Sequence, residues 1–133
     1  MSLTKTVLQP PGWAAPKGYA NGVAAQGRLV CVAGQIGWNA QCQFDSDDLV
    51  AQTRQALANV RAVLAEAGAG PEHMVRMTWY VTRRADYLAR SREIGAAYRE
   101  VMGREYDVAM TAVEVSALME ARAVVEIEVT AVI

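Results

Sequence analysis

The sequence has few of the residues on which many kinds of functional site depend. It contains a single histidine, His73, and two cysteines, Cys31 and Cys42, among 133 residues. Cys31 lies in an apolar run and Cys42 in a polar stretch, so the pair shows neither the spacing of a metal site nor that of a disulfide framework. One histidine also does not supply a histidine-based metal site or a catalytic triad. We therefore expect no bound metal and no other cofactor.

The chain also lacks a strong charge of one sign and a long apolar run. Its formal net charge is −1, with both signs mixed along the sequence. That balance provides no basic surface for nucleic acid and no polybasic strip for a membrane. No apolar run approaches the ~20 residues that a membrane span needs, and the N-terminus does not resemble a signal peptide. We expect a soluble cytoplasmic protein that binds neither nucleic acid nor membranes.

The sequence does have enough apolar residues for one compact domain. Hydrophobic residues make up 53% of the chain and charged residues 20%, a balance typical of a single hydrophobic core. Residues 1–17 contain three of the four prolines and are expected to form an irregular arm, with at most one short strand at Thr4–Gln9. The chain is thus expected to form one domain over residues 1–133.

Two amphipathic helices are predicted, with strands before, between and after them. The first helix follows an N-cap cluster at residues 45–48 and stops at Gly68, and the second spans Ala85–Met102. Alternation and β-branched residues predict the strands Thr4–Gln9, Val23–Gln26, Leu29–Ile36, Met74–Thr82, Val108–Ala117 and Arg122–Val132. One sheet carrying both helices on a single face would satisfy this order.

The pattern predicts two hairpins. A turn at residues 27–28 would join Val23–Gln26 to Leu29–Ile36, a strand so apolar at its start that we expect it to be buried on both faces. The last two strands would pair over Leu118–Ala121, which places Met110 opposite Glu126 on the same face of the sheet. That shared face is where chemistry is expected.

The second face of the sheet is also predicted to be apolar. The residues expected on it are Val30, Val32, Ile36, Val108, Met110 and Val124. Two helices are enough to cover only one face, so the other would be exposed in a monomer. We therefore expect an α+β protein with a mixed sheet that buries its second face by association of subunits.

Six segments, in their order and spacing, resemble the reactive intermediate deaminase family of RidA-like or YjgF-like proteins, once labelled endoribonucleases (L-PSP-like) or translation inhibitors. They are GYANGV near the start, VAGQIGWNA at 32–40, QTRQALANVRAVLAEAGA at 52–69, VRMTWYVT at 75–82, AMTAVEVSAL at 109–118 and VVEIEVTAVI at 124–133. The resemblance covers most of the chain. It implies a chorismate-mutase-like α+β fold that forms a homotrimer, with sites in the clefts between subunits.

The resemblance also implies a reaction. Active members hydrolyse an enamine or imine to a ketoacid and ammonia; an arginine holds the substrate carboxylate and a glutamate of the last strand assists the attacking water. Glu126 matches that glutamate, Tyr19 the tyrosine of the early motif, and Gly34 the glycine at a strand end. Met110 stands where the family has its arginine, and Thr111 follows it.

The residues themselves leave alternatives open. Glu126 is either a site acid or a structural carboxylate that pairs with Arg122 or Arg76, and Gly34 is either a cleft residue or a packing glycine. Met110 is most simply an apolar cleft wall, since methionine carries no charge. The expected substrate-binding set is Tyr19, Gly34, Trp38, Met110 and Thr111, and Arg90 or Arg92 is considered as a substitute for the lost guanidinium.

Two functions are compatible with this set. The first is hydrolytic deamination of an enamine, an imine or an aminated unsaturated acid, and the second is a small-molecule-binding or regulatory trimer without that chemistry. Loss of the arginine removes roughly 1.5–3 kcal/mol for each charge-assisted hydrogen bond, which disfavours ordinary amino-acid-derived imino acids as substrates. In both cases the partner is a small metabolite. We expect no hydrolysis of RNA, because the chain has no histidine pair and no net positive charge.

Overall fold

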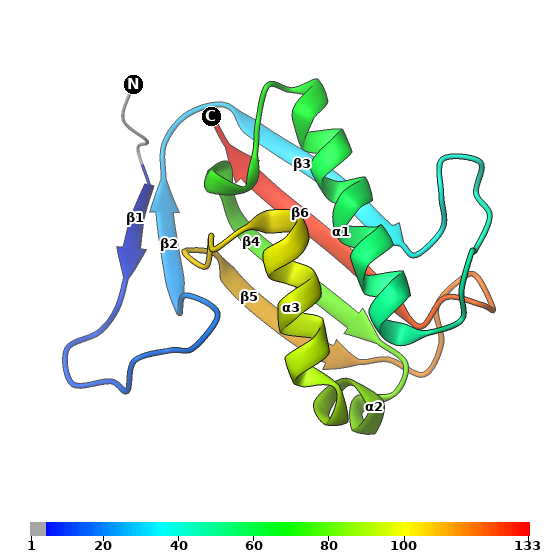
Figure 1. The fold of residues 1–133 in the computed structure, drawn as a ribbon. Coiled ribbons are helices and arrows are strands. Elements are labelled where there is room, and N and C mark those ends of the chain that lie inside the picture. Colours follow the sequence, from blue (N-terminus) through cyan, green and yellow to red (C-terminus); the bar gives the residue numbers. More distant parts are fainter. Residues whose placement is uncertain (1–4) are drawn as a thin grey trace.

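The computed structural model describes residues 5–133, which form a four-stranded mixed sheet, a separate two-stranded sheet and a layer of helices (Figure 1). The elements are β1 (Lys5–Leu8), β2 (Gly22–Ala25), β3 (Leu29–Ile36), α1 (Leu49–Glu66), the 3-10 turn η1 (Pro71–His73), β4 (Met74–Val81), α2 (Arg84–Ala89), α3 (Ser91–Met102), β5 (Ala109–Glu114) and β6 (Val125–Val132). The predicted strand Thr4–Gln9 corresponds to β1, which ends at Leu8, one residue before Gln9; Thr4 lies outside the described residues.

The larger sheet has the strand order β3-β6-β4-β5. The last strand of the chain, β6, runs antiparallel to both β3 and β4, whereas β5 runs parallel to β4. Alternate residues of β6 are buried: Val125, Ile127, Val129 and Ala131. They face the helices together with Met77, Trp79 and Val81 of β4, because residues paired across a ladder share a face.

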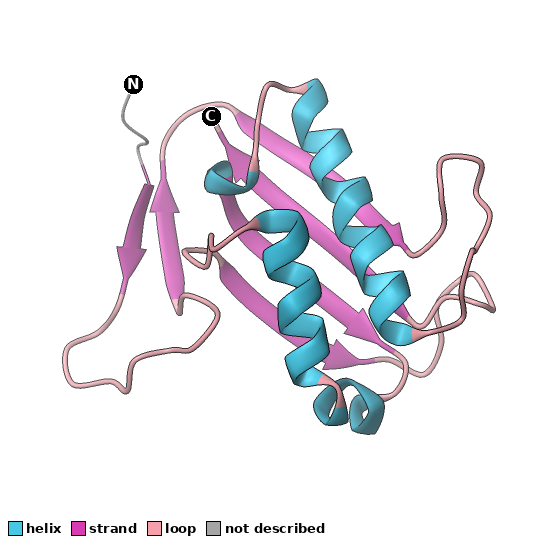
Figure 2. Ribbon diagram, in the orientation of Figure 1, coloured by secondary structure: helices cyan, strands magenta, loops and turns pink. Residues whose placement is uncertain are grey.

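The helices α1 and α3 lie side by side across one face of this sheet (Figure 2). Asp48 caps α1 by accepting a hydrogen bond from the Ala51 amide at 3.0 Å, and Gly68 follows the helix with φ +73°. The residues that α1 and α3 bury are, in chain order, Leu49, Val50, Gln52, Thr53, Ala56, Leu57, Val60, Leu64, Ile94, Ala97, Tyr98 and Met102. The predicted α+β fold, with a mixed sheet and its helices on one face, is confirmed.

The second helix differs from its prediction in one respect. It is interrupted at Arg90, whose φ and ψ are −112° and 23°, so that α2 and α3 are separate helices. None of the helices in residues 5–133 is both long enough and apolar enough to cross a membrane.

The predicted hairpin between β2 and β3 is wrong. β2 pairs with β1 in the two-stranded sheet, and β3 pairs with β6. The reason lies in the connection: Arg28 exchanges backbone hydrogen bonds with Ile133, one of them at 2.9 Å, so the chain extends the β3–β6 ladder there instead of closing a tight turn. β3 is consequently an edge strand whose Leu29, Cys31 and Ala33 are exposed, and it is not buried on both faces.

The predicted hairpin between the last two strands is also wrong, because β4 lies between β5 and β6. Residues 115–124 pass over the end of β4, where the Val115 amide donates to the Val81 carbonyl at 2.8 Å. Met110 pairs with Met77, and Glu126 pairs with Tyr80. Residues 77 and 80 have opposite parity on β4, so Met110 and Glu126 lie on opposite faces of the sheet and not across from each other.

The composition of the open sheet face also differs from the prediction. Val32 and Val108 are buried within the single chain, and Val30, Met110 and Val124 pack against its core. Because Leu29–Ala33 of β3 is apolar at every position, the sequence does not reveal which face of this strand meets the helices. Register places a more mixed set on the open face, namely Leu29, Cys31, Ile36, Arg76, Thr78, Tyr80, Ala109, Thr111, Val113, Glu126, Glu128, Thr130 and Val132; of the predicted residues it confirms Ile36, which pairs with Glu126.

One buried polar side chain connects three separate segments. Gln52 of α1 is 1% exposed, and its Nε2 donates to the carbonyls of Ser46 at 3.1 Å and Arg122 at 2.9 Å. Its Oε1 accepts from the Val124 amide at 3.0 Å. A Cβ on Gly37 would lie 2.4 Å from the Gln52 Cβ, so a glycine is needed at that position for α1 to approach the strand end.

We predict that Gln52→Ala lowers the free energy of unfolding by about 2–4 kcal/mol, because it removes a buried side chain and leaves three partly buried backbone groups without this partner. Urea denaturation would measure the change. Gln41→Ala is the matched control, since Gln41 is exposed, and it should shift the transition by less than about 0.5 kcal/mol. Equal effects of the two substitutions would contradict a structural role for the Gln52 amide.

Candidate functional site

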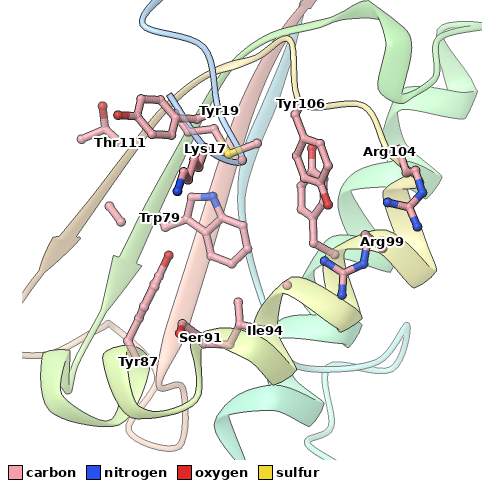
Figure 3. Close-up of a pocket in the computed structure, with 15 residues that line it drawn as sticks. Lys17, Tyr19, Trp79, Tyr87, Ser91, Ile94, Arg99, Arg104, Tyr106 and Thr111 are labelled. Carbon is pink, nitrogen blue, oxygen red and sulfur yellow. The ribbon is translucent and has the colours of Figure 1, made fainter. Parts of the chain in front are cut away.

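A cavity of about 630 Å³ lies beside α3 and the edge strand β5 (Figure 3). Its lining residues are Lys17, Gly18, Tyr19, Trp79, Tyr87, Ser91, Ile94, Gly95, Tyr98, Arg99, Arg104, Tyr106, Met110, Thr111 and Ala112. They come from α2, α3, β4, β5, the loop before β2 and the loop between α3 and β5. This volume is within the range of about 300–1,000 Å³ that is common for small-molecule sites.

The early glycine-containing loop reaches the cavity because it is attached to the start of β5. The Ala20 amide donates to the Val108 carbonyl at 2.9 Å, and Ala20 forms a parallel bridge with Ala109. Ala20 is buried, while its neighbour Tyr19 is exposed and lines the cavity. The structure thus brings together three of the predicted site residues, Tyr19, Met110 and Thr111.

Aromatic rings form much of the cavity wall. Trp79 and Tyr87 meet edge to face with their ring centroids 6.3 Å apart, and Tyr98 stacks on Tyr106 at 5.3 Å. Burial raises the pKa of the Tyr87 phenol, and burial together with the nearby Glu105 carboxylate raises that of Tyr98. Both phenols therefore stay neutral at physiological pH, and the rings present uncharged surfaces.

The charged residues of the lining are all basic. They are Lys17, Arg99 and Arg104, and no acidic residue lines the cavity among the residues described. Arg99 folds over Gly95, where a built Cβ would lie 3.4 Å from its Nη1 atom. Sequence reasoning missed these cations because basic residues near the end of a helix usually lie on a solvated face.

The two arginines considered as substitutes for the lost guanidinium do not line this cavity. Arg90 forms ion pairs with Asp48 and with Glu93, the latter at 2.8 Å. Arg92 is exposed on α3. The positive charge beside the cavity is instead supplied by Arg99 in the last turn of α3, by Arg104 just after the helix and by Lys17 in the loop before β2.

The predicted acid lies on the opposite side of the sheet. Glu126 is half-buried, and a Cβ built on Gly34 would come within 2.0 Å of its Oε2 atom. The structure therefore brings Glu126 and Gly34 together. The φ of Gly34 is not in the left-handed region, so the glycine is needed for the space above it and not for its backbone conformation.

Glu126 does not form the structural ion pair with Arg122 or Arg76 that was considered as the alternative to a role in the site. Arg122 pairs with Asp47 at 2.9 Å, and Glu126 forms no ion pair within residues 5–133. Its strand neighbour Glu128 has a partner, since it accepts a hydrogen bond from the Tyr80 hydroxyl. That bond is the main cause of a raised Tyr80 pKa, to which the charge of Glu126 also contributes. Of the two carboxylates on this face, only Glu126 remains without a hydrogen-bond partner in the described part of the chain.

Trp38 occupies a third location. It lines a separate hollow with Cys42, Gln43, Phe44, Glu120, Ala121 and Arg122. Its ring lies 5.9 Å from that of Phe44, and the Arg122 guanidinium lies 5.3 Å from the Phe44 ring centroid. In the single chain, Trp38 is thus not part of the cavity that contains Tyr19 and Met110.

The chemistry available to the cavity follows from its lining. Among residues 5–133 its lining includes no aspartate, glutamate, histidine or cysteine, so these residues can bind an anion but supply no carboxylate, imidazole or thiol for proton transfer. The unpartnered carboxylate of Glu126 lies on the other face of the same sheet. In the described residues no three side chains of His, Cys, Asp or Glu gather closely enough to hold a metal ion.

We predict that Gly34→Ala destabilises the protein by about 1 kcal/mol, because its Cβ displaces the Glu126 carboxylate. In a Glu126→Ala background the same substitution should be neutral or slightly stabilising, since glycine is disfavoured in strands. A double-mutant cycle measured by urea denaturation at one protein concentration would give the coupling energy. Additive effects would show that the two residues do not contact each other.

Comparison with known proteins agrees with this fold. A RutC family protein of Synechocystis sp. is 32% identical over 134 residues, which cover 98% of each chain. The crystal structure of the Rid family protein YyfB from Yersinia pestis, described as of unknown function, has a TM-score of 0.83 and 34% identity, covering 98% of this chain and 100% of that one. RidA from Psychrobacter sp. has a TM-score of 0.69 and 26% identity, with 90% and 92% of the two chains covered. The model of the Endoribonuclease L-PSP family matches residues 12–133, and the chain belongs to this family of RidA- and YjgF-like proteins.

Proposed function

We propose that this protein is a homotrimer that hydrolyses an enamine, an imine or an aminated unsaturated acid at sites formed between subunits. One subunit supplies the aromatic, basic cavity, and a neighbouring subunit supplies Glu126. The observation that carries this proposal is that Trp79 and Met110 of the cavity wall lie on the face of the sheet opposite Glu126, and the cavity reaches the open face only at Thr111 on the edge strand β5. A carboxylate cannot reach through its own sheet, so a complete site requires a second copy of the chain.

The cavity is placed suitably for such an arrangement. It runs along β5, which forms one edge of the sheet, and β3 forms the other edge, so both strands have unpaired backbone groups. The open face also exposes Leu29 and Val113, at 64% and 42% of their surfaces. Association through the sheet edges and the open face would bury these groups and bring Glu126 of one subunit to the cavity of another.

In the proposed reaction an enamine first becomes an imine by moving a proton from its nitrogen to carbon. Water then adds to the C=N carbon, and Glu126 accepts a proton from the water and gives it to the nitrogen, which forms a carbinolamine. The same carboxylate next takes the proton of the carbinolamine hydroxyl and passes it to the nitrogen, so ammonia leaves and the carbonyl of the ketoacid forms. A single carboxyl group that is not held by an ion pair suits both steps, because it both accepts and donates.

The competing function is a trimer that binds a small molecule without converting it. The observation that favours it is Met110, which lines the cavity and supplies no charge where active relatives are expected to hold a carboxylate. Cleavage of RNA is not proposed, because the chain has one histidine and a net charge of −1.

We predict that light scattering gives a mass three times that of one chain. Val113→Asp should weaken the assembly, because it places a charge on the open face of the sheet. Val63→Asp is the matched control: Val63 is 40% exposed on α1, against 42% for Val113, and its substitution should leave the mass unchanged. A monodisperse wild-type monomer at micromolar concentration would rule out sites between subunits.

We predict that the wild-type protein releases ammonia from an aminated unsaturated acid and that Glu126→Ala reduces the rate about a hundredfold or more. Glu128→Ala is the control, because Glu128 lies on the same strand face and is held by Tyr80. Met110→Arg should increase hydrolysis of enzymatically generated 2-aminoacrylate. If the wild type is inactive on both compounds while Met110→Arg gains activity, the binding function is correct and the catalytic one is not.

A further inference from the structure

We propose that the cavity recognises a ring-bearing carboxylate, whose carboxylate is held by Arg99 and Arg104 and whose ring lies against Trp79. This inference rests on the proposed function for the location of the site, and it specifies the class of ligand. It assigns the anion contact to the end of α3 and not to β5, where Met110 stands.

The first support is the sign of the charge. The lining has three cations and no acid among the described residues, and none of the three forms an ion pair in that part of the chain. Arginines that belong to structural networks have carboxylate partners, as Arg90 does with Asp48 and Glu93. Arg99 and Arg104 are therefore available to an anion from solution, and a guanidinium matches a carboxylate with two parallel hydrogen bonds.

The second support is the position of Arg99. Its side chain turns back along α3 over Gly95, with Nη1 at contact distance from the place a Cβ would occupy. Gly95 itself lines the cavity, so the guanidinium is directed along the cavity wall. Figure 3 shows Arg99 and Arg104 on the same side of the cavity, with Lys17 and Tyr19 on the other side of Trp79.

The third support is the nature of the walls between these cations. Trp79 is held by its edge-to-face contact with Tyr87 and reaches the cavity with the 5% of its surface that is exposed, whereas the half-buried Tyr87 and Tyr106 present more of their rings. Fixed aromatic faces favour a flat apolar group that stacks on them. A three-carbon acid such as 2-aminoacrylate would leave most of this surface without contacts. Although a neighbouring subunit would occupy part of the volume, the aromatic walls belong to one chain.

The test uses three unreactive probes, namely 3-phenylpropanoate, 3-phenylpropanamide and propanoate, measured by isothermal titration calorimetry. The first has both a ring and a carboxylate, the second has only the ring, and the third has only the carboxylate. We expect 3-phenylpropanoate to bind the wild type at least about tenfold more tightly than either of the others. Its affinity should fall as salt is added, because the two arginines are exposed.

Substitutions then locate the carboxylate. Arg99→Gln and Arg104→Gln should each weaken 3-phenylpropanoate binding by roughly tenfold and leave the binding of 3-phenylpropanamide unchanged. Arg99→Lys should restore part of the loss, since it keeps the charge without the planar fork. Arg92→Gln is the matched control: Arg92 is exposed on the same helix, lies outside the cavity, and should have no effect.

Several results would overturn the inference. They are equal affinity for the acid and its amide, equal affinity for the acid and propanoate, no binding of any probe, or a loss in Arg92→Gln as large as in Arg99→Gln. The probes contain no C=N bond, so their binding does not depend on hydrolysis. Arginine-dependent binding without ammonia release would support the ligand class and contradict the proposed reaction, and the reverse result would contradict the ligand class alone.

Discussion

The structure depends on the insertion of the last strand, β6, between β3 and β4. Ladders on both sides satisfy the backbone of β6 and bury Val125, Ile127 and Val129 under the helices. Gln52 of α1 then accepts from the Val124 amide just before this strand, so the helix layer is tied to the strand's entry point. Because β6 follows the other described elements in sequence, the central part of the sheet is complete only when residues 125–132 have joined it.

The same insertion divides the candidate site. With β4 lying between β5 and β6, the alternation of side chains sends Met110 to the helix side and Glu126 to the open side. Gly34 leaves room for the Glu126 carboxylate above β3, and the attachment of Ala20 to β5 fixes Tyr19 beside Met110. Met110 and Glu126, which the proposed function assigns to binding and to acid–base chemistry, are consequently on different faces of the sheet.

The sequence was sufficient to predict the helices and strands but not to predict which strands pair with each other in the sheet. Alternation identified β6 and its buried set, because a half-buried strand has a clear period of two. It could not show that residues 115–124 cross the end of β4, since hydrogen-bond partners far apart in sequence leave no local pattern. The wrong β5–β6 hairpin led to a second wrong prediction, because it placed Met110 on the same face of the sheet as Glu126. For the same reason Arg99 and Arg104 were not found: only the folded chain places them beside Trp79 and Tyr19.

Methionine at position 110 changes which residues of the cavity can hold the carboxylate of a ligand. A guanidinium there would hold a carboxylate close to β5, between Tyr19 and Trp79, and would leave little of the aromatic wall for other parts of a ligand. With Met110, this part of the cavity is apolar, and the available positive charge lies at the end of α3. An anion held by Arg99 would direct the remainder of the molecule back across Trp79 toward β5. Under the proposed assignment of the site, methionine in place of an arginine thus changes which ligand is bound, and in which direction, and does not remove the binding site.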